Sequence, residues 1–359
     1  MSQRGSARTR RHAVGPFLLS AAGHGRLLNV GYWGRTTRPI AERIRSVGPR
    51  WHTSPFDAHP AIPLDKSWRG SPRKNDNTPA WRASLRAMGW DAARMTAEII
   101  AVAAHKGGQT KTSTSVNLSA GLARASSRVL LVDCDAQANS TSMYADEDDI
   151  EFDLLDIVKR DVDPHKAVCE TRIPGLHLLP STLAVARLDQ ELITMHRREE
   201  QIAQALAPLA DEYDVMVLDL SPNLGPVVIA ALCAATSLIV PTDASRWGRR
   251  GVSMFLEWSE DLRTAKVLSA DLLGVLLTKY EQGTLISREV HRDLRQSGLP
   301  LFKTLIPKRT AAERMVAEKL VMGDEGADMD LSEAYGKLTL EVIERVNAVR
   351  GERLTEGSA

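Results

Sequence analysis

The stretch 99–119 limits the folds open to this chain more than any other part of the sequence. It begins with an apolar run, Ile99–Ala104, which predicts a buried strand. A tight loop over 105–110 follows, and apolar residues at Val116 and Leu122 then predict a helix that packs on a sheet. A strand, a glycine loop and a helix in this order are typical of a phosphate-binding cradle.

The residue types in the loop fit phosphate chemistry. Gly107 and Gly108 let backbone N–H groups approach phosphate oxygens, where a side chain would collide. The N-terminus of the following helix adds its partial positive charge. In such a cradle Lys111 would reach the β- and γ-phosphates, and the hydroxyl of Thr112 would bind Mg²⁺.

Two positions depart from the strict rule Gly-x4-Gly-Lys-Ser/Thr, because His105 and Thr110 stand where its glycines should be, and Lys106 precedes the glycine pair. The loop resembles the deviant Walker loop of the ParA/MinD ATPases, whose usual form is Lys-Gly-Gly-x-Gly-Lys-Thr/Ser. The resemblance implies that Lys106 reaches the phosphates of a partner subunit in an ATP-bound dimer. It also implies nucleotide contacts from Lys106, Gly107, Gly108, Gln109, Thr110, Lys111, Thr112 and Ser113.

A second segment carries the same resemblance. Residues 133–141 follow the predicted strand 128–133 and are similar to the family signature Asp-x-Asp-Pro-Gln-x-Asn-x-Thr, with Ala136 in place of Pro. The resemblance implies that Asp135 positions the attacking water and supports the metal shell, which suits phosphoryl transfer because an aligned water and Mg²⁺ matter there more than a strong base. A helix cap is the alternative role for an Asp at a strand end.

Further along, the resemblance is carried by a third buried strand and two softer matches. Residues 213–222 resemble the family's Walker B strand, so Asp219 would support the metal. Residues 273–280 and 306–309 resemble segments that flank the adenine, which implies contacts from Thr278, Lys279 and Pro307, although ordinary strand ends are the alternative. The implied catalytic residues are Lys106, Lys111 and Asp135, and the implied metal residues are Thr112, Asp135 and Asp219.

From Met95 onward, apolar runs alternate with helical patterns. This alternation predicts an α/β fold, a doubly wound and mostly parallel sheet with helices on both faces, and the resemblance places it among the P-loop NTPases of the deviant Walker class. In such sheets a ligand binds at the carboxyl ends of the strands. Strands are expected at 99–104, 128–133, 176–179, 215–219, 237–240 and 272–277, and helices at 196–210, 227–235, 251–263, 286–296, 311–320 and 331–348.

Residues 1–94 differ in composition from the rest of the chain. They hold 17 Lys and Arg against 5 Asp and Glu, and five of the seven Trp, without a sustained period of 3.6 or 2. Three interpretations stay open: a disordered basic arm that contacts nucleic acid, a small DNA-binding domain, or an upstream stretch read as protein from a wrong start codon. The third is favoured by Met95, which lies where short ParA-type proteins begin. The expected division is therefore an extension over 1–94, an ATPase domain over 95–350 and a flexible tail over 351–359.

Charge and cysteine usage limit the compartment and the partners that this chain is expected to have. Three scattered cysteines indicate a reducing compartment without a disulfide framework, and no apolar run approaches the ~20 residues that span a bilayer. Residues 95–359 carry 29 Lys and Arg against 40 Asp and Glu, yet basic residues cluster late. The family binds DNA non-specifically through such a face, and a solvated helix surface is the alternative. The cluster comprises Arg288, Arg292, Arg295, Lys303, Lys308 and Arg309.

The resemblance covers about 95–350 and implies a cytoplasmic, nucleoid-associated ATPase that partitions plasmids or chromosomes. It would bind ATP and Mg²⁺, form a homodimer, coat DNA, and be released when a ParB-type centromere-binding partner stimulates hydrolysis. One alternative is a nucleotide-gated DNA-binding switch with impaired hydrolysis. Another is a MinD-type membrane ATPase, which is disfavoured because residues 350–359 lack an apolar face.

Thr110 bears on the choice between the ATPase and the switch. At the family's glycine position the backbone often takes dihedrals that only Gly adopts easily, and a β-branched residue is stiff there. Strain of this kind costs ~1–3 kcal/mol, or about 5- to 150-fold in affinity if all of it falls on the bound state. Alternatively, the loop has adjusted, so that Gln109 and Thr110 take ordinary negative φ and the Thr110 hydroxyl bonds a phosphate. We expect Thr110→Gly to tighten ATP binding and raise hydrolysis.

Overall fold

A seven-stranded sheet lies at the centre of the part of the chain that the computed structural model describes, residues 97–108 and 110–356. The strand order is β3-β4-β2-β5-β1-β6-β7. Neighbouring strands run parallel, except that β3 pairs antiparallel with β4. The mostly parallel α/β fold expected from the sequence is therefore confirmed. The strands are β1 (Glu98–Val102), β2 (Val129–Cys134), β3 (Cys169–Glu170), β4 (Leu176–Leu179), β5 (Val215–Leu220), β6 (Ser237–Asp243) and β7 (Asp271–Thr278).

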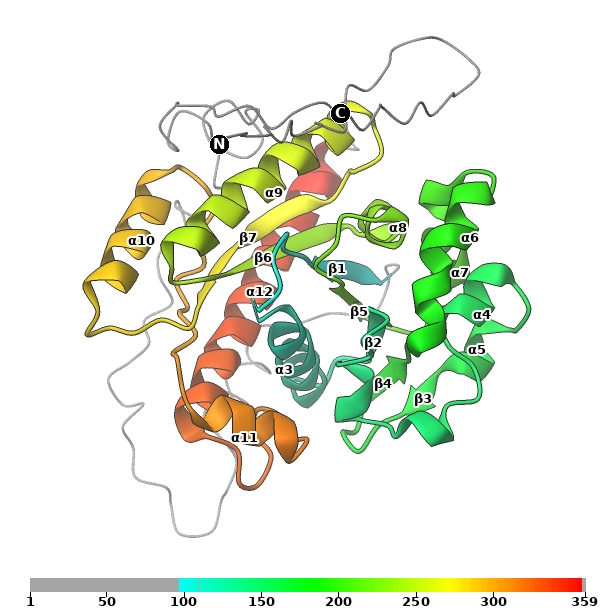
Figure 1. Cartoon of the computed structure of the whole chain (residues 1–359), viewed down its shortest axis with the longest axis horizontal. Helices are drawn as coiled ribbons and strands as arrows, with labels where there is room; N and C mark the ends of the chain where they lie inside the picture. The colour runs from blue at the N-terminus through cyan, green and yellow to red at the C-terminus, as the bar shows by residue number, and fades with distance from the viewer. Residues whose placement is uncertain (1–96, 109, 357–359) are drawn as a thin grey trace, which may run out of the picture. The chain divides into compact units, whose positions relative to one another are not determined.

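Helices cover both faces of this sheet (Figure 1). Helices α3, α11 and α12 contribute to one apolar cluster, and α4 and α6–α10 contribute to the other. The extension expected over 1–94 lies outside the described residues. The helices are α3 (Lys111–Arg124), α4 (Leu154–Lys159), α5 (Pro164–Ala167), α6 (Leu188–Thr194), α7 (Gln201–Leu206), α8 (Pro226–Ala234), α9 (Arg246–Thr264), α10 (Leu285–Gln296), α11 (Ala311–Ala317) and α12 (Met329–Glu356).

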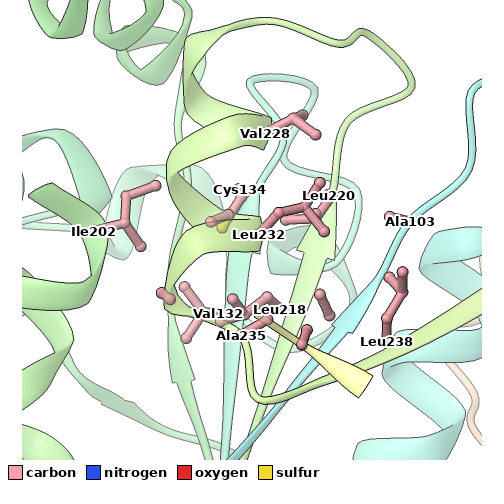
Figure 2. Close-up of a cluster of buried hydrophobic side chains, with 14 of the residues drawn as sticks. Ala103, Val132, Cys134, Ile202, Leu218, Leu220, Val228, Leu232, Ala235 and Leu238 are labelled. Atoms are coloured by element: carbon pink, nitrogen blue, oxygen red, sulfur yellow. The ribbon is translucent and has the colours of Figure 1, made fainter. Parts of the chain in front are cut away.

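Alternate residues of the same strands build the two apolar clusters. In β2, Leu130 and Val132 belong to the cluster that includes α8, whereas Val129 and Leu131 belong to the cluster that includes α3 and α12. Figure 2 shows side chains of α8, Leu232 among them, close to those of the strands beneath. Strands buried on both faces read as continuous apolar runs, which is why the sequence located them to within a few residues.

The helix expected over 196–210 is divided in the structure. A 3-10 turn (Arg198–Glu200) leads into α7, and a second 3-10 turn (Ala207–Leu209) follows it. Arg197 has φ +50°, which no α-helix contains, and Pro208 in the second turn has no N–H to donate. The short elements β3 and α4–α6 were not predicted, because segments of two to seven residues carry too little periodicity.

Helix α12 continues through Glu356, into the stretch 351–359 that the sequence assigned to a flexible tail, and 357–359 lie outside the described residues. Two arginines bind the C-terminal end of α12 to the sheet through ion pairs. Arg350 Nε lies 3.1 Å from Glu98 Oε2 on β1, and Arg353 Nη2 lies 2.9 Å from Asp271 Oδ2 on β7. Within the described residues, no helix is long and apolar enough to cross a membrane.

Candidate functional site

Three adjacent strands, β2, β5 and β1, bring their carboxyl ends to one edge of the sheet. Asp219 of β5 stands in register between Asp133 of β2 and Val102 of β1. The loop that leaves β1 ends at the first residue of α3, Lys111. The fold therefore gathers the phosphate loop and the strand-end carboxylates that the sequence singled out, although they are far apart in the chain.

Lys111 is the buried cation of this edge, with a relative exposure of 7%. Its Nζ donates a hydrogen bond to the carbonyl oxygen of Lys106 over 3.4 Å. Burial lowers the pKa of Lys111, and the charges of Asp219 and Asp135 oppose this shift. An ammonium group that a loop carbonyl holds, and whose pKa responds to the charges of two nearby carboxylates, is placed to receive a polyanion. Lys106 itself is exposed, so its own side chain is open to solvent.

Asp219 is almost fully buried and accepts hydrogen bonds from several hydroxyls. Ser115 Oγ donates to Oδ1 over 2.9 Å and Ser140 Oγ to Oδ2 over 2.6 Å, and Thr112 also donates to this carboxylate. Burial raises the pKa of Asp219, and the hydroxyl donors and the charge of Lys111 oppose this shift. Because the Thr112 hydroxyl donates its hydrogen bond to Asp219, the lone pairs of its oxygen stay available to a cation.

This donor set fits a magnesium ion better than a soft metal. Among the described residues, no three His, Cys, Asp or Glu side chains come together as a metal site. Mg²⁺ usually takes one or two protein oxygens and completes its shell with water and phosphate. Ser115 and Ser140 were missed by sequence reasoning. The available signals were that Ser115 lies one helical turn after Lys111 and that Ser140 lies within the signature segment 133–141.

Asp133 organises the turn that presents Asp135. Its fully buried carboxylate accepts hydrogen bonds from the backbone N–H of Asp135 over 3.0 Å, from that of Thr141 over 2.8 Å, and from the Thr141 hydroxyl over 2.9 Å. Burial, followed by the charge of Asp219, raises the pKa of Asp133 to about 7. Asp135 is half-buried, and its Oδ1 accepts from the N–H of Gln137 over 3.0 Å.

Thr110 caps the start of α3 in the left-handed region, with φ +59° and ψ +27°. The alternative in which Thr110 adopts a negative φ is therefore wrong. Gly108 has φ +74°, so the loop needs two left-handed residues and only one of them is Gly. For a β-branched residue this conformation is a true outlier. Gln109 lies outside the described residues.

Lys279, the first residue after β7, contacts the phosphate loop directly. Its Nζ donates a hydrogen bond to the carbonyl oxygen of Gly108 over 3.0 Å. Pro307 lies on the neighbouring segment, bridged to Tyr280, whereas the buried Thr278 turns its hydroxyl to the carbonyl oxygen of Thr242 over 3.0 Å. Lys279 is thus brought to the loop, Pro307 lies beside Tyr280, and the hydroxyl of Thr278 is engaged with β6.

The basic residues expected to contact DNA fall into two groups. Arg288, Arg292 and Arg295 of α10 line a cavity of about 370 Å³ together with Tyr280, His291 and Gln296. Lys308 lies 2.8 Å from Glu281, and Arg309 lies 3.4 Å from Asp328 and 2.9 Å from Asp330. The α10 group therefore surrounds a hollow, with Arg292 Nε 3.8 Å from Asp293, while Lys308 and Arg309 are engaged with carboxylates.

Known proteins are similar to this chain over the same region. A family model described as an AAA domain matches residues 97–271. The sporulation initiation inhibitor protein Soj of Bacillus subtilis is 34% identical over 215 residues, which cover 59% of this chain and 84% of Soj. The chromosome-partitioning ATPase Soj of Thermus thermophilus is 33% identical over 249 residues, 69% of this chain and 96% of that protein. Among solved structures, cobyrinic acid a,c-diamide synthase from Mycobacterium smegmatis with bound ADP and magnesium aligns with a TM-score of 0.59 at 31% identity, over 68% of this chain and 92% of that one.

Proposed function

We infer the function from the family: this chain belongs to the ParA family of partitioning ATPases, and we propose that it binds and hydrolyses ATP with Mg²⁺ to drive DNA partitioning. The observation that carries the proposal is the position of Lys111, buried at the start of α3 between the phosphate loop and the carboxylates of Asp135 and Asp219. The names of two relatives support it, since one is a chromosome-partitioning ATPase and another was solved with ADP and magnesium.

In this proposal each residue at the strand ends has one task. Lys111 binds the β- and γ-phosphates, and the Thr112 oxygen, oriented by Asp219, is a ligand for Mg²⁺. The bound cation neutralises charge on the phosphates and orients their oxygens. Asp135 accepts a hydrogen bond from the attacking water and aligns it, since it lies half-exposed beside the cradle. Lys106, exposed on the loop, reaches the phosphates of a partner subunit in a homodimer.

The proposed DNA surface is centred on α10. Arg288, Arg292 and Arg295 lie on one helix around a hollow, an arrangement that suits contacts with backbone phosphates rather than with base edges. The ATP-bound dimer would associate with the nucleoid through this surface, and a ParB-type protein would stimulate its release. The domain expected over 95–350 would carry out that cycle.

A second candidate function is favoured by one observation, the left-handed conformation of Thr110. Strain beside the phosphates could slow hydrolysis while leaving binding intact. The protein would then be a nucleotide-gated DNA-binding switch, in which ATP controls the bound state and turnover contributes little.

Calorimetry and turnover assays on the full chain separate these candidates. We expect ATP·Mg²⁺ to bind with a measurable Kd, turnover to rise when DNA is added, and Lys111→Ala to abolish binding, because it removes the cation at the phosphates. Binding without DNA-stimulated turnover would select the switch. Equal ATP affinity in Lys111→Ala and the parent would reject the phosphate-loop assignment itself.

A further inference from the structure

Lys279 is fixed in space more firmly than an exposed lysine usually is. The carbonyl of Thr278 accepts from the N–H of Ala244 over 3.0 Å, and the N–H of Tyr280 donates to the carbonyl of Ile306 over 2.9 Å. The backbone on both sides of Lys279 is therefore tied to neighbouring segments. Lys279 itself has φ +50°, a conformation that lysine seldom adopts. In that conformation its ammonium group meets the carbonyl of Gly108.

The phosphate loop that Lys279 contacts is loosely packed at its two glycines. A Cβ atom added to Gly107 or to Gly108 would encounter no described atom within 4 Å. Two ammonium groups instead hold loop carbonyls, Lys111 at the carbonyl of Lys106 and Lys279 at the carbonyl of Gly108. The ammonium group of Lys279 offsets the negative end of the Gly108 carbonyl, which would otherwise repel phosphate.

We propose that Lys279 is a positioning residue that holds the phosphate loop in its strained shape, with Thr110 left-handed, before nucleotide binds. The inference rests on the proposed ATP-binding function, and it assigns Lys279 to the loop rather than to the adenine. A loop with two left-handed residues, one of them β-branched, relaxes easily when nothing holds it. With Lys279 in place, the cost of the Thr110 conformation falls on folding and not on nucleotide binding.

A double-mutant cycle on the full chain tests the proposal. Lys279→Met keeps the aliphatic stem and removes the charge, and we expect it to weaken ATP binding about tenfold, the lower end of the range for one hydrogen bond to a charged donor. KM for ATP should rise by the same factor as Kd while kcat stays within about twofold. In a Thr110→Gly background the same substitution should cost less than about twofold, because glycine adopts the required conformation freely. The proposal also replaces the expectation drawn from the sequence that Thr110→Gly alone tightens ATP binding: with Lys279 in place, that substitution should raise Tm and change ATP affinity little.

Lys266→Met is the matched control, since Lys266 is also an exposed lysine with positive φ, at +60°, and lies at the end of α9. It should leave ATP affinity unchanged. Equal losses from Lys279→Met in both backgrounds, or no loss in either, would refute the coupling. A loss seen with ATP but not with GTP would assign Lys279 to the base instead.

Hydrogen exchange keeps this inference separate from the proposed function, because it needs no nucleotide. Amide exchange over 106–110 should be faster in Lys279→Met than in the parent, and unchanged in Lys266→Met. A parent that fails to bind ATP while Lys279→Met still loosens the loop would reject the proposed function but leave the positioning role standing. Unchanged exchange in Lys279→Met would reject the positioning role.

Discussion

At the scale of single residues, the site is built around two buried carboxylates in register, Asp133 and Asp219. They differ in the groups that donate hydrogen bonds to them. Asp219 accepts hydrogen bonds from side-chain hydroxyls at the ligand edge of the sheet. Asp133 accepts hydrogen bonds from two backbone N–H groups and from the Thr141 hydroxyl, all of which belong to the turn that carries Asp135. Asp133 therefore has a structural task and Asp219 a task at the ligand, although each is the second-last residue of its strand and the two strands are neighbours.

The raised pKa of Asp133 predicts a pH dependence of stability. Because its pKa is about 7 in the folded chain and near 4 in the unfolded chain, the folded state binds more protons between these values. The contribution of Asp133 is fully present below pH ~4 and is lost as the pH rises through ~7. We expect the Tm of Asp133→Asn, by calorimetry from pH 5 to pH 8, to fall less than that of the parent. Parallel Tm curves would show that Asp133 is ionised throughout.

At the scale of elements, α12 is the helix that joins α3 to the end of the sheet. A side chain at Gly121 would overlap Thr339, so α3 and α12 can only pack this closely with glycine there. Farther along, Arg345 is 3% exposed and donates to the carbonyls of Leu273 and Leu301, to Glu341, and lies over the ring of Phe302. One buried guanidinium thus ties α12 to β7 and to the segment after α10.

Arg345→Met should be strongly destabilising. It keeps apolar bulk over the ring but leaves Glu341 buried without its cation, and removal of one partner of a buried pair typically costs ~3–5 kcal/mol. Urea unfolding measures this loss. Lys337→Met on the same helix is the control, because its pair with Glu333 is exposed and should be worth less than ~1 kcal/mol. Similar losses in both variants would contradict the role given to Arg345.

The prediction for DNA binding concerns the arginines of helix α10. We expect substitution of Arg288 and Arg295 by Gln to weaken binding to DNA of any sequence, and to lower the slope of log K against log salt by about 2, since each removes roughly one phosphate contact. Arg309→Gln is the control, because two carboxylates already neutralise Arg309. Binding measured across a salt series decides between them, and a larger effect from Arg309 would move the DNA surface away from α10.

At the scale of the whole molecule, the described residues, 97–108 and 110–356, contain a sheet with both faces covered by helices. The sequence predicted this arrangement because six of its strands are apolar runs. It could not predict contacts between distant segments, such as Lys279 with Gly108, or Arg353 with Asp271, since no local pattern records them. For the same reason, the sequence left two alternatives for the backbone conformation of Thr110, and the structure was needed to choose the left-handed one.

A chain of residues 95–359 is expected to unfold in one cooperative transition and to bind ATP with the parent's affinity, because residues 1–94 carry no sustained period of 3.6 or 2. Thermal unfolding and calorimetry on this shortened protein, beside the full chain, test the expectation. Loss of the cooperative transition would show that residues 1–94 belong to the fold.

The position of β1 in the sheet has a consequence for biosynthesis. β1 opens the described fold, yet its neighbours are β5, where Glu98 pairs with Val215, and β6, where Ile100 pairs with Ser237. On the ribosome, the phosphate loop therefore emerges long before the strands that hold it. A nascent chain that stops before Val215 leaves both edges of β1 open, and one that stops before Ser237 leaves one edge open. Capture of a nucleotide by this fold belongs to a nearly finished chain.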